Sequence, residues 1–171
     1  MKQIHILLLF APFFLFSCDD DPVVIETKLP LTLSFEVNEA SAIEHESGRT
    51  DYAFTGSETY SLNGHDDLKD KLDDITYILG KSVNYGLSGL SEGDTINHLI
   101  VSVGETTMEI NTPDSLTFTS NGMLGGGYAA FGEDLMEDKQ ITVTVKGTTR
   151  KAPMNFDVNL ELLIEAVLAD K

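Results

Sequence analysis

Hydrophobic and polar residues alternate along several stretches of this chain. Residues 31–37 read LTLSFEV and residues 141–148 read ITVTVKGT, each with an apolar side chain at almost every second position. Residues 154–164, MNFDVNLELLI, continue the same alternation over a longer stretch. A period of two places one row of side chains in a core and the other in water, which is typical of half-buried antiparallel strands.

Glycine-containing pairs between the apolar runs indicate tight turns. The Gly-Lys pair at 80–81 and the Gly-Glu pair at 104–105 suit type II′ hairpins, and the Asn-Gly pair at 121–122 suits a type I′ hairpin. A further hairpin is expected at 150–153, with a proline where no ladder donor is needed. Many short strands and tight turns predict a mainly β fold, an antiparallel, immunoglobulin-like β-sandwich of seven or more strands.

Two stretches depart from this alternation and predict one or two short helices. Leu68, Leu72 and Ile75 recur at helical spacing, and an aspartate or asparagine just before them can cap a helix. We therefore expect a helix over residues 65–73. A second helical turn is expected within residues 131–138, FGEDLMED.

The N-terminal segment carries a different pattern. Lys2 is followed by an apolar run over residues 6–16, and Ser17 and Cys18 come next. A positive start before a short apolar run is typical of a secretory signal, and the run is too short to span a bilayer. This cysteine is the single one in the chain, so a lipidated Cys18 would leave no disulfide in the mature protein.

The four residues LFSC at 15–18 resemble the lipobox of bacterial lipoproteins. The resemblance implies that residues 1–17 are a signal peptide and that Cys18 is lipidated after cleavage. Phe16 departs from the small or aliphatic residue usual at its position, as in the looser boxes of Bacteroidota. Two or more acyl chains anchor a protein stably, whereas one binds only marginally. The alternative is an ordinary signal peptide followed by an incidental thiol.

Three aspartates, Asp19, Asp20 and Asp21, follow the cysteine directly. They resemble the acidic export tag of surface-exposed Bacteroidota lipoproteins, which implies an outer-membrane protein displayed on the cell surface. Two alternatives stay open: an aspartate after the cysteine also resembles the enterobacterial inner-membrane retention signal, and like charges also serve as an extended, solvated tether. Residues 18–28 are then the lipidated Cys and acidic tether, and residues 29–171 a single β-sandwich domain.

The net charge narrows the classes of partner. The whole chain has 11 basic and 28 acidic residues, and residues 1–17 contain one Lys, so the mature formal charge is 11 − 1 − 28 = −18. Nucleic-acid affinity comes largely from Lys and Arg that neutralise phosphates, so a nucleic-acid partner is not expected. Attachment to a membrane is expected through the N-terminal lipid rather than through basic residues.

No metal-binding motif is found in the sequence, and no cofactor is expected. The histidines His45, His65 and His98 are not within ligand spacing of one another, and the acidic stretch 66–74 lacks the glycine and spacing of an EF-hand. The alternative is a calcium site from loop carboxylates such as Asp94 or Asp114. His98 is expected to point to water.

Catalytic motifs are missing as well, so the protein is not expected to be an enzyme. The chain contains neither a G-x-S-x-G elbow nor a phosphate-binding glycine loop. The glycines at 125–127 are interpreted as a bulge or a kinked strand edge. A hydrolase with an unrecognised site is the least favoured alternative.

Aromatic residues could form a platform for sugars, but most are expected in the core, Tyr77 and Tyr85 included. Tyr128 with Phe131 is the expected exposed pair and the possible ligand contact. Thr95 and Ser115 each follow an aspartate and precede an aliphatic residue, which resembles the short sequon for O-glycosylation of exported Bacteroidota proteins. The sequence thus predicts a lipid-anchored, non-catalytic binding module for an unknown protein or glycan. The alternative is a structural or assembly subunit of an envelope complex.

Overall fold

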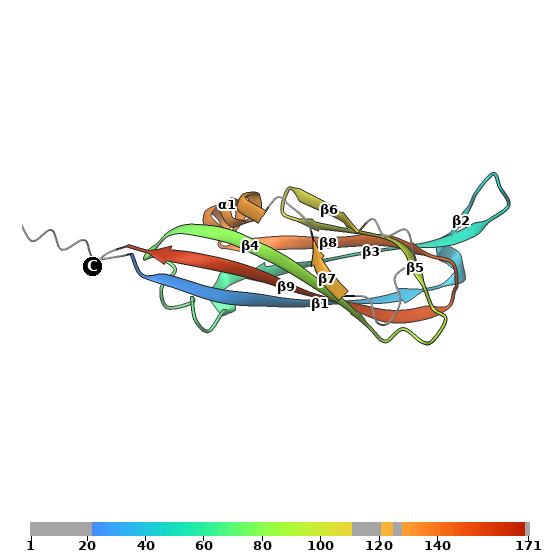
Figure 1. Ribbon diagram of the computed structural model, residues 1–171, viewed down its shortest axis with the longest axis horizontal. Helices are drawn as coiled ribbons and strands as arrows, with labels where there is room; N and C mark the ends of the chain where they lie inside the picture. Colours follow the sequence, from blue (N-terminus) through green and yellow to red (C-terminus); the bar gives the residue numbers. More distant parts are fainter. Residues whose placement is uncertain (1–21, 111–120, 125–127, 170–171) are drawn as a thin grey trace, which may run out of the picture.

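A computed structural model describes residues 22–110, 121–124 and 128–169, and Figure 1 shows them as two β-sheets lying face to face. The four-stranded sheet has the order β1 (Val24–Val37), β9 (Met154–Leu168), β4 (Ile75–Ser88), β7 (Asn121–Leu124). The five-stranded sheet has the order β2 (Ala42–Glu44), β3 (Thr50–Ser61), β8 (Gln140–Thr149), β5 (Ile96–Val103), β6 (Thr106–Ile110). Neighbouring strands are antiparallel, so the predicted mainly β sandwich is confirmed.

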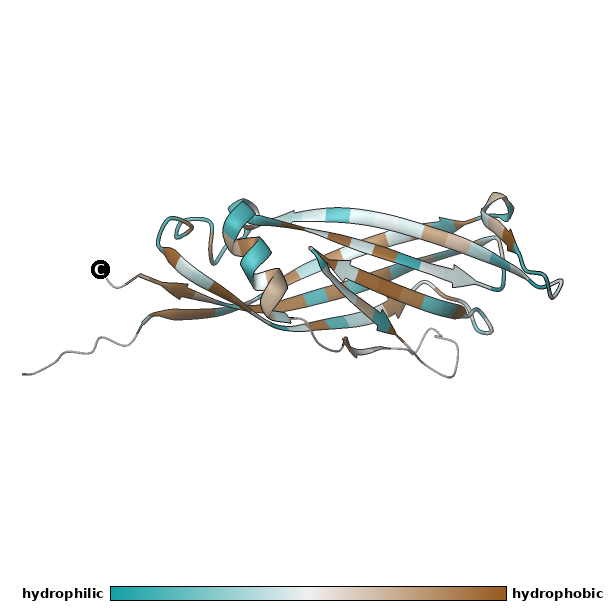
Figure 2. Ribbon diagram, turned by 90° about the horizontal axis from the view of Figure 1, so that it is seen from above, coloured by the Kyte–Doolittle hydropathy of each residue, from teal (hydrophilic) through white to brown (hydrophobic). Residues whose placement is uncertain are grey.

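The alternation seen in the sequence builds the core between the sheets. The apolar positions of β1, β8 and β9 are buried and their neighbours are exposed or half-buried, which appears in Figure 2 as alternating hydrophobic and hydrophilic bands. Phe35 on β1, Phe54 on β3 and Phe156 on β9 meet with ring centroids 4.9 to 5.3 Å apart. This cluster joins the two sheets close to the end where β1 finishes and β9 begins.

Strand β4 corrects two predictions. It runs through Gly80 and Lys81 without turning back, because a register shift against β9 absorbs the extra residue as a bulge. A second shift between Ile75 and Tyr77 changes which residues face the core. Tyr77 is therefore 42% exposed, and Tyr85 is half-buried rather than a full core residue.

Of the other predicted turns, one is confirmed and two are wrong as hairpins. Gly104 has a φ of +56° and begins the two-residue connection between β5 and β6. The Asn-Gly pair at 121–122 lies inside β7, where it pairs with β4. Residues 150–153 do form a connection, with a cis Ala152–Pro153 bond, but it joins β8 of one sheet to β9 of the other.

Of the two helix predictions, one is confirmed and the other is wrong. The predicted helical turn at 131–138 is confirmed as part of α1 (Tyr128–Asp138). The predicted helix at 65–73 is wrong: a short 3-10 helix, η2 (Leu62–Gly64), is followed by successive hydrogen-bonded turns. Aspartate is a poor helix former because its carboxylate competes for backbone donors, and this stretch contains four aspartates. A second 3-10 helix, η1 (Glu39–Ser41), precedes β2.

The sandwich has two ends that differ in what they carry. At one end, which we call the tether end because the expected tether precedes it, β1 begins at Val24 opposite Val167, close to the end of β9. At the far end, β1 finishes at Val37 opposite Met154, and the β2–β3 hairpin projects from the body in Figure 1. Within the described ranges, no helix is long and apolar enough to cross a bilayer.

Candidate functional site

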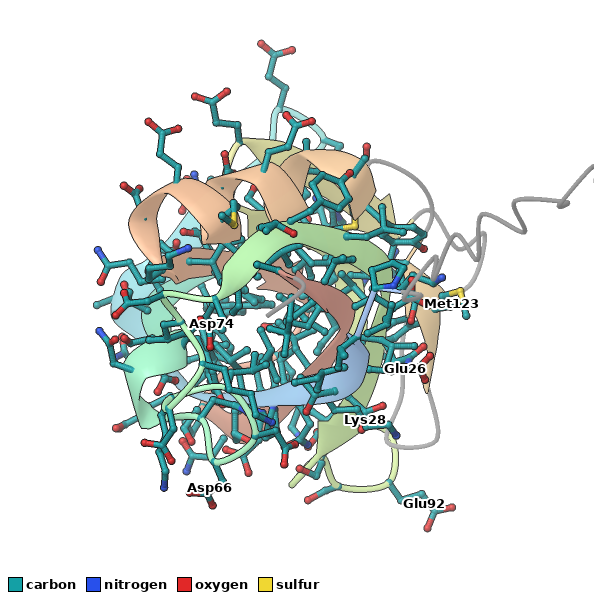
Figure 3. All side chains as sticks on the ribbon, turned by 90° about the vertical axis from the view of Figure 1, so that its left-hand side faces the viewer. Glu26, Lys28, Asp66, Asp74, Glu92 and Met123 are labelled. Carbon is teal, nitrogen blue, oxygen red and sulfur yellow. The ribbon has the colours of Figure 1, made fainter. Side chains whose placement is uncertain are left out.

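A polar cleft of about 660 Å³ lies at the tether end. Its walls come from residues 26–30 of β1, Tyr60 at the end of β3, and residues 64–67 in the turns after η2. Figure 3 looks onto this end and shows Glu26, Lys28 and Asp66 around it. The cleft therefore presents carboxylates, a lysine, hydroxyl groups and an aromatic ring close together.

His65 and Thr27 are buried polar residues of the cleft, and the hydrogen bonds of His65 define its tautomer. The backbone N–H of Asp67 donates to Nδ1 at 3.3 Å, so the proton of the neutral ring is on Nε2. Nε2 then donates to the carbonyl oxygen of Lys28 at 3.1 Å. His65 thus fastens the turns after η2 to strand β1.

Thr27 lies beside this ring but does not form a nucleophile–base pair with it. Its hydroxyl donates to Oδ2 of Asp67 at 2.9 Å, and its oxygen lies 3.4 Å from Nε2 of His65. A catalytic base must accept the hydroxyl proton on a free ring nitrogen, whereas here Nε2 carries the proton and the hydroxyl is turned to a carboxylate. The contact joins strand β1 to the turns after η2.

The charges at the cleft mouth keep both donors and acceptors available. The hydrogen bond and the charge of Lys69 lower the pKa of the exposed Asp66 carboxyl, so this residue is an anion at neutral pH. Burial, and then the charge of Asp66, raise the pKa of Tyr60, so its hydroxyl keeps its proton. The Tyr60 ring also packs near His65, with centroids 6.2 Å apart. This arrangement suits a ligand that carries hydroxyl or amide groups.

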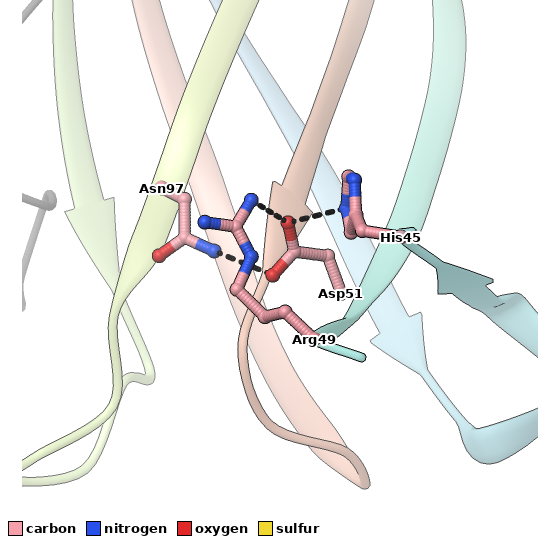
Figure 4. A network of polar contacts seen from close by, with 4 residues as sticks. All are labelled: His45, Arg49, Asp51 and Asn97. Atoms are coloured by element: carbon pink, nitrogen blue, oxygen red, sulfur yellow. Dashed lines mark hydrogen bonds and ion pairs between the residues drawn. The ribbon is translucent and has the colours of Figure 1, made fainter. Parts of the chain in front are cut away.

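The far end holds a second polar network, shown in Figure 4. Asp51 is only 3% exposed and accepts from Nη2 of Arg49 at 2.7 Å. Its carboxylate also contacts Nε2 of His45 at 3.0 Å and Nδ2 of Asn97 at 3.5 Å. These contacts fix the β2–β3 hairpin against the start of β5.

Asp94, a candidate calcium ligand at the far end, already accepts two hydrogen bonds. Nζ of Lys151 donates to Oδ1 at 2.6 Å and the backbone N–H of Ser91 donates to Oδ2 at 3.0 Å. The lysine hydrogen bond lowers the pKa of Asp94 although burial opposes that shift. Asp114 lies outside the described residues, and among the residues that are described no three acidic, histidine or cysteine side chains are arranged to hold a metal.

The predicted exposed aromatic pair is wrong for Phe131. Its side chain is fully buried, and its ring meets that of Tyr128 edge to face at 6.4 Å. A Cβ on Gly80 would come within 2.7 Å of the Phe131 ring, so the bare glycine lets α1 settle onto β4 with this ring beneath it. Phe131 is therefore a core residue, and Tyr128 is half-buried beside it.

The other residues singled out by the sequence lie partly inside and partly outside the described ranges. Cys18, the aspartates 19–21, the glycines 125–127 and Ser115 lie outside the described residues, and Thr95 is half-buried in the loop before β5. His98 is confirmed as water-facing, with Nε2 placed 2.5 Å from Oε1 of Glu109. His65 was expected in a helical turn, and the sequence carries no signal that β1 would lie over it.

No family model matches this chain, and no curated protein matches it. Among solved structures, a chain described as Desmodium yellow mottle tymovirus aligns over 100% of this chain and 98% of its own, with 11% identity and a TM-score of 0.39. A likeness at that level carries no argument about function.

Proposed function

We propose that this protein is a lipid-anchored module of the bacterial cell envelope that binds a partner without catalysing a reaction. Cys18 is its lipidated residue, and the outer-membrane surface is its location, with a periplasm-facing position as the alternative. The observation that carries the proposal is the placement of the start of β1 at one end of an elongated sandwich. The immunoglobulin-like connectivity stays a prediction, since the strand pairing establishes the sandwich alone.

The length of the chain supports this arrangement. The stretch from Cys18 to Val23 can span at most about 18 Å, even fully extended. Strand β1 has 14 residues, which at ~3.4 Å per residue carries the far end about 45 Å beyond the tether end. A lipid on Cys18 would therefore hold the tether-end cleft close to the membrane and extend the β2–β3 hairpin away from it.

A structural or assembly role is the second candidate, and the far end favours it. All three residues of β2 are exposed, with the apolar Ile43 at 42%. Strand β2 is also an edge of the five-stranded sheet, where an unpaired backbone can accept another strand. A subunit of an envelope complex could dock on this edge.

The anchor is tested by Cys18→Ala. We expect the variant to lose metabolic labelling by a palmitate analogue and to leave the membrane fraction, because no thiol remains to receive the lipid. Ser17→Ala is the matched control, since it keeps a small residue before the cysteine and should keep the label. Undiminished labelling of Cys18→Ala would contradict the anchor.

Protease treatment of intact cells tests the location. Cleavage of the domain in intact cells supports surface display, whereas cleavage only after the outer membrane is opened supports the periplasm-facing alternative. Replacing Asp19, Asp20 and Asp21 with asparagine should protect the domain in intact cells if these residues direct export. The Cys18→Ala variant, which we expect to be released from the membrane as a soluble periplasmic protein, serves as the control for leakage of protease through the outer membrane.

A further inference from the structure

Gly80 and Gly86, both on β4, differ in the space that a side chain would have at each position. Gly80 is needed by packing, since a Cβ there would lie within 2.7 Å of the Phe131 ring. A Cβ on Gly86 would meet nothing within 4 Å among the described residues, and its φ is not in the left-handed region. Glycine inside a strand costs backbone entropy and often marks a place where a ligand approaches the backbone. Neither steric nor backbone requirements explain Gly86.

The strand register shows what surrounds Gly86 on the outer face of the four-stranded sheet. One row across the sheet contains Thr32, Asn159 and Gly86, and the next row contains Pro30, Glu161 and Asn84. These residues line a hollow of about 400 Å³, which we call the Gly86 hollow. Asn159 is half-buried while its neighbour Leu160 points into the core, which places the row on the outer face.

Asn159 is held in position before any ligand arrives. Its Oδ1 accepts from the Thr32 hydroxyl at 2.9 Å, and its Nδ2 donates to the Ser88 hydroxyl at 2.9 Å. Each amide atom keeps one further hydrogen-bonding position. A side chain that is fixed in this way loses little entropy when a ligand binds. The hollow therefore offers a preset donor and acceptor.

The other residues that line the Gly86 hollow favour one class of ligand. Glu161 is paired with Nζ of Lys28 at 3.0 Å, so the charges at the rim cancel. Asn84 adds an amide whose side chain has no hydrogen-bond partner among the described residues, and Pro30 adds an apolar surface. Uncharged amides and a hydroxyl beside an apolar patch match a sugar ring, which has hydroxyl edges and C–H faces, better than they match an ion.

We propose that the Gly86 hollow binds a neutral saccharide unit, with Asn159 and Asn84 contacting its hydroxyl groups and the missing side chain of Gly86 making room for the ring. The site extends the proposed binding role to a second place on the molecule. It depends neither on the anchor at Cys18 nor on the cleft at His65.

The test uses the full-length protein in detergent micelles on an array of neutral oligosaccharides containing glucose, galactose, mannose and N-acetylglucosamine. Wild type should be retained by at least one of them. Gly86→Val should weaken that binding about tenfold or more because its side chain occupies the hollow. Valine also suits a strand better than glycine, so the thermal midpoint should stay unchanged or rise. Asn84→Ala should weaken binding too and gives a second variant should valine disturb the fold.

A control separates the hollow from the rest of the surface. Thr55→Val places a valine side chain on the exposed face of the other sheet and should bind sugar like wild type. The proposal is overturned if wild type binds none of the neutral sugars, or if Gly86→Val binds them as well as wild type does. Binding of an extended peptide at the hollow, with no sugar bound, would overturn it too. Loss of labelling by Cys18→Ala concerns the anchor alone.

Discussion

The two ends of the sandwich each bury a polar side chain, and they stabilise it differently. At the far end, Asp51 is buried as a carboxylate beside the Arg49 guanidinium and the His45 ring, both of which are about half exposed. At the tether end, His65 is buried as a neutral ring that hydrogen-bonds to backbone groups. Arg49 and His45 can reach water when they lose Asp51, whereas the part-buried contact at the Lys28 carbonyl loses the donor that His65 supplies.

The difference also concerns which segments are joined. Arg49 and His45, which contact Asp51, lie two and six positions away in the chain, within the β2–β3 hairpin. The carbonyl that His65 contacts is 37 positions away, on β1. The Arg49 and His45 contacts therefore order a local hairpin, to which Asn97 adds one contact from β5, while His65 holds a turn segment against strand β1. We expect the tether end to lose more stability when its histidine is removed.

The largest expected effect follows from His65→Ala. The change leaves the Lys28 carbonyl and the Asp67 N–H without the partners that His65 supplies and removes the ring that packs near Tyr60. We expect the free energy of unfolding to fall by about 2–3 kcal/mol. Guanidinium denaturation followed by circular dichroism measures it.

His98→Ala is the matched control on an exposed strand face. His98 pairs with Glu109 in water, so its removal should cost about 0.5 kcal/mol or less. Equal losses of unfolding free energy for the two histidine variants would contradict the expected difference between buried and exposed histidines. A smaller loss for His65→Ala than for His98→Ala would reverse it.

The contrast also shows where sequence reasoning succeeded. Alternation predicted the buried faces of β1, β8 and β9, because a period of two depends only on residues within one strand. It failed on β4, where bulges arise from pairing with β9 and move Tyr77 to the surface. His65 and Phe131 are buried by segments distant in the chain, β1 and β4, and no local pattern reports such neighbours. The Gly86 hollow likewise exists only once three strands are placed in register.

The far end is tested by Asp51→Asn, which keeps the shape of the side chain and removes its charge. The contacts with Arg49 and His45 lose their charge-assisted character, and we expect a loss of about 1–2 kcal/mol in the free energy of unfolding. Denaturation at neutral pH measures the change. Glu109→Gln makes the same carboxylate-to-amide change at an exposed pair and should have almost no effect. Stability equal to wild type for Asp51→Asn would show that the network adds nothing.

The smallest effect concerns Asp94 and has a distinctive dependence on pH. Lys151 lowers the pKa of Asp94 in the folded protein below its ordinary value of 3.8. The ionised form is then favoured by folding, so the contribution to stability is present above that value and disappears as the pH falls through the folded pKa. Lys151→Met should therefore cost up to about 1 kcal/mol at neutral pH, since the lysine is largely exposed.

The measurement compares the unfolding free energies of wild type and Lys151→Met between pH 2 and pH 7. Their difference should shrink as the pH falls below about 4, because a protonated Asp94 no longer gains from the lysine charge. Lys146→Met changes an exposed lysine for which no ion pair is found among the described residues, and its effect should not depend on pH in this range. A constant difference for Lys151→Met would mean that packing of the lysine chain, and not its charge, stabilises this loop. In that case the far end would rely on charge only at Asp51, and the contrast between the two ends would rest on that one carboxylate.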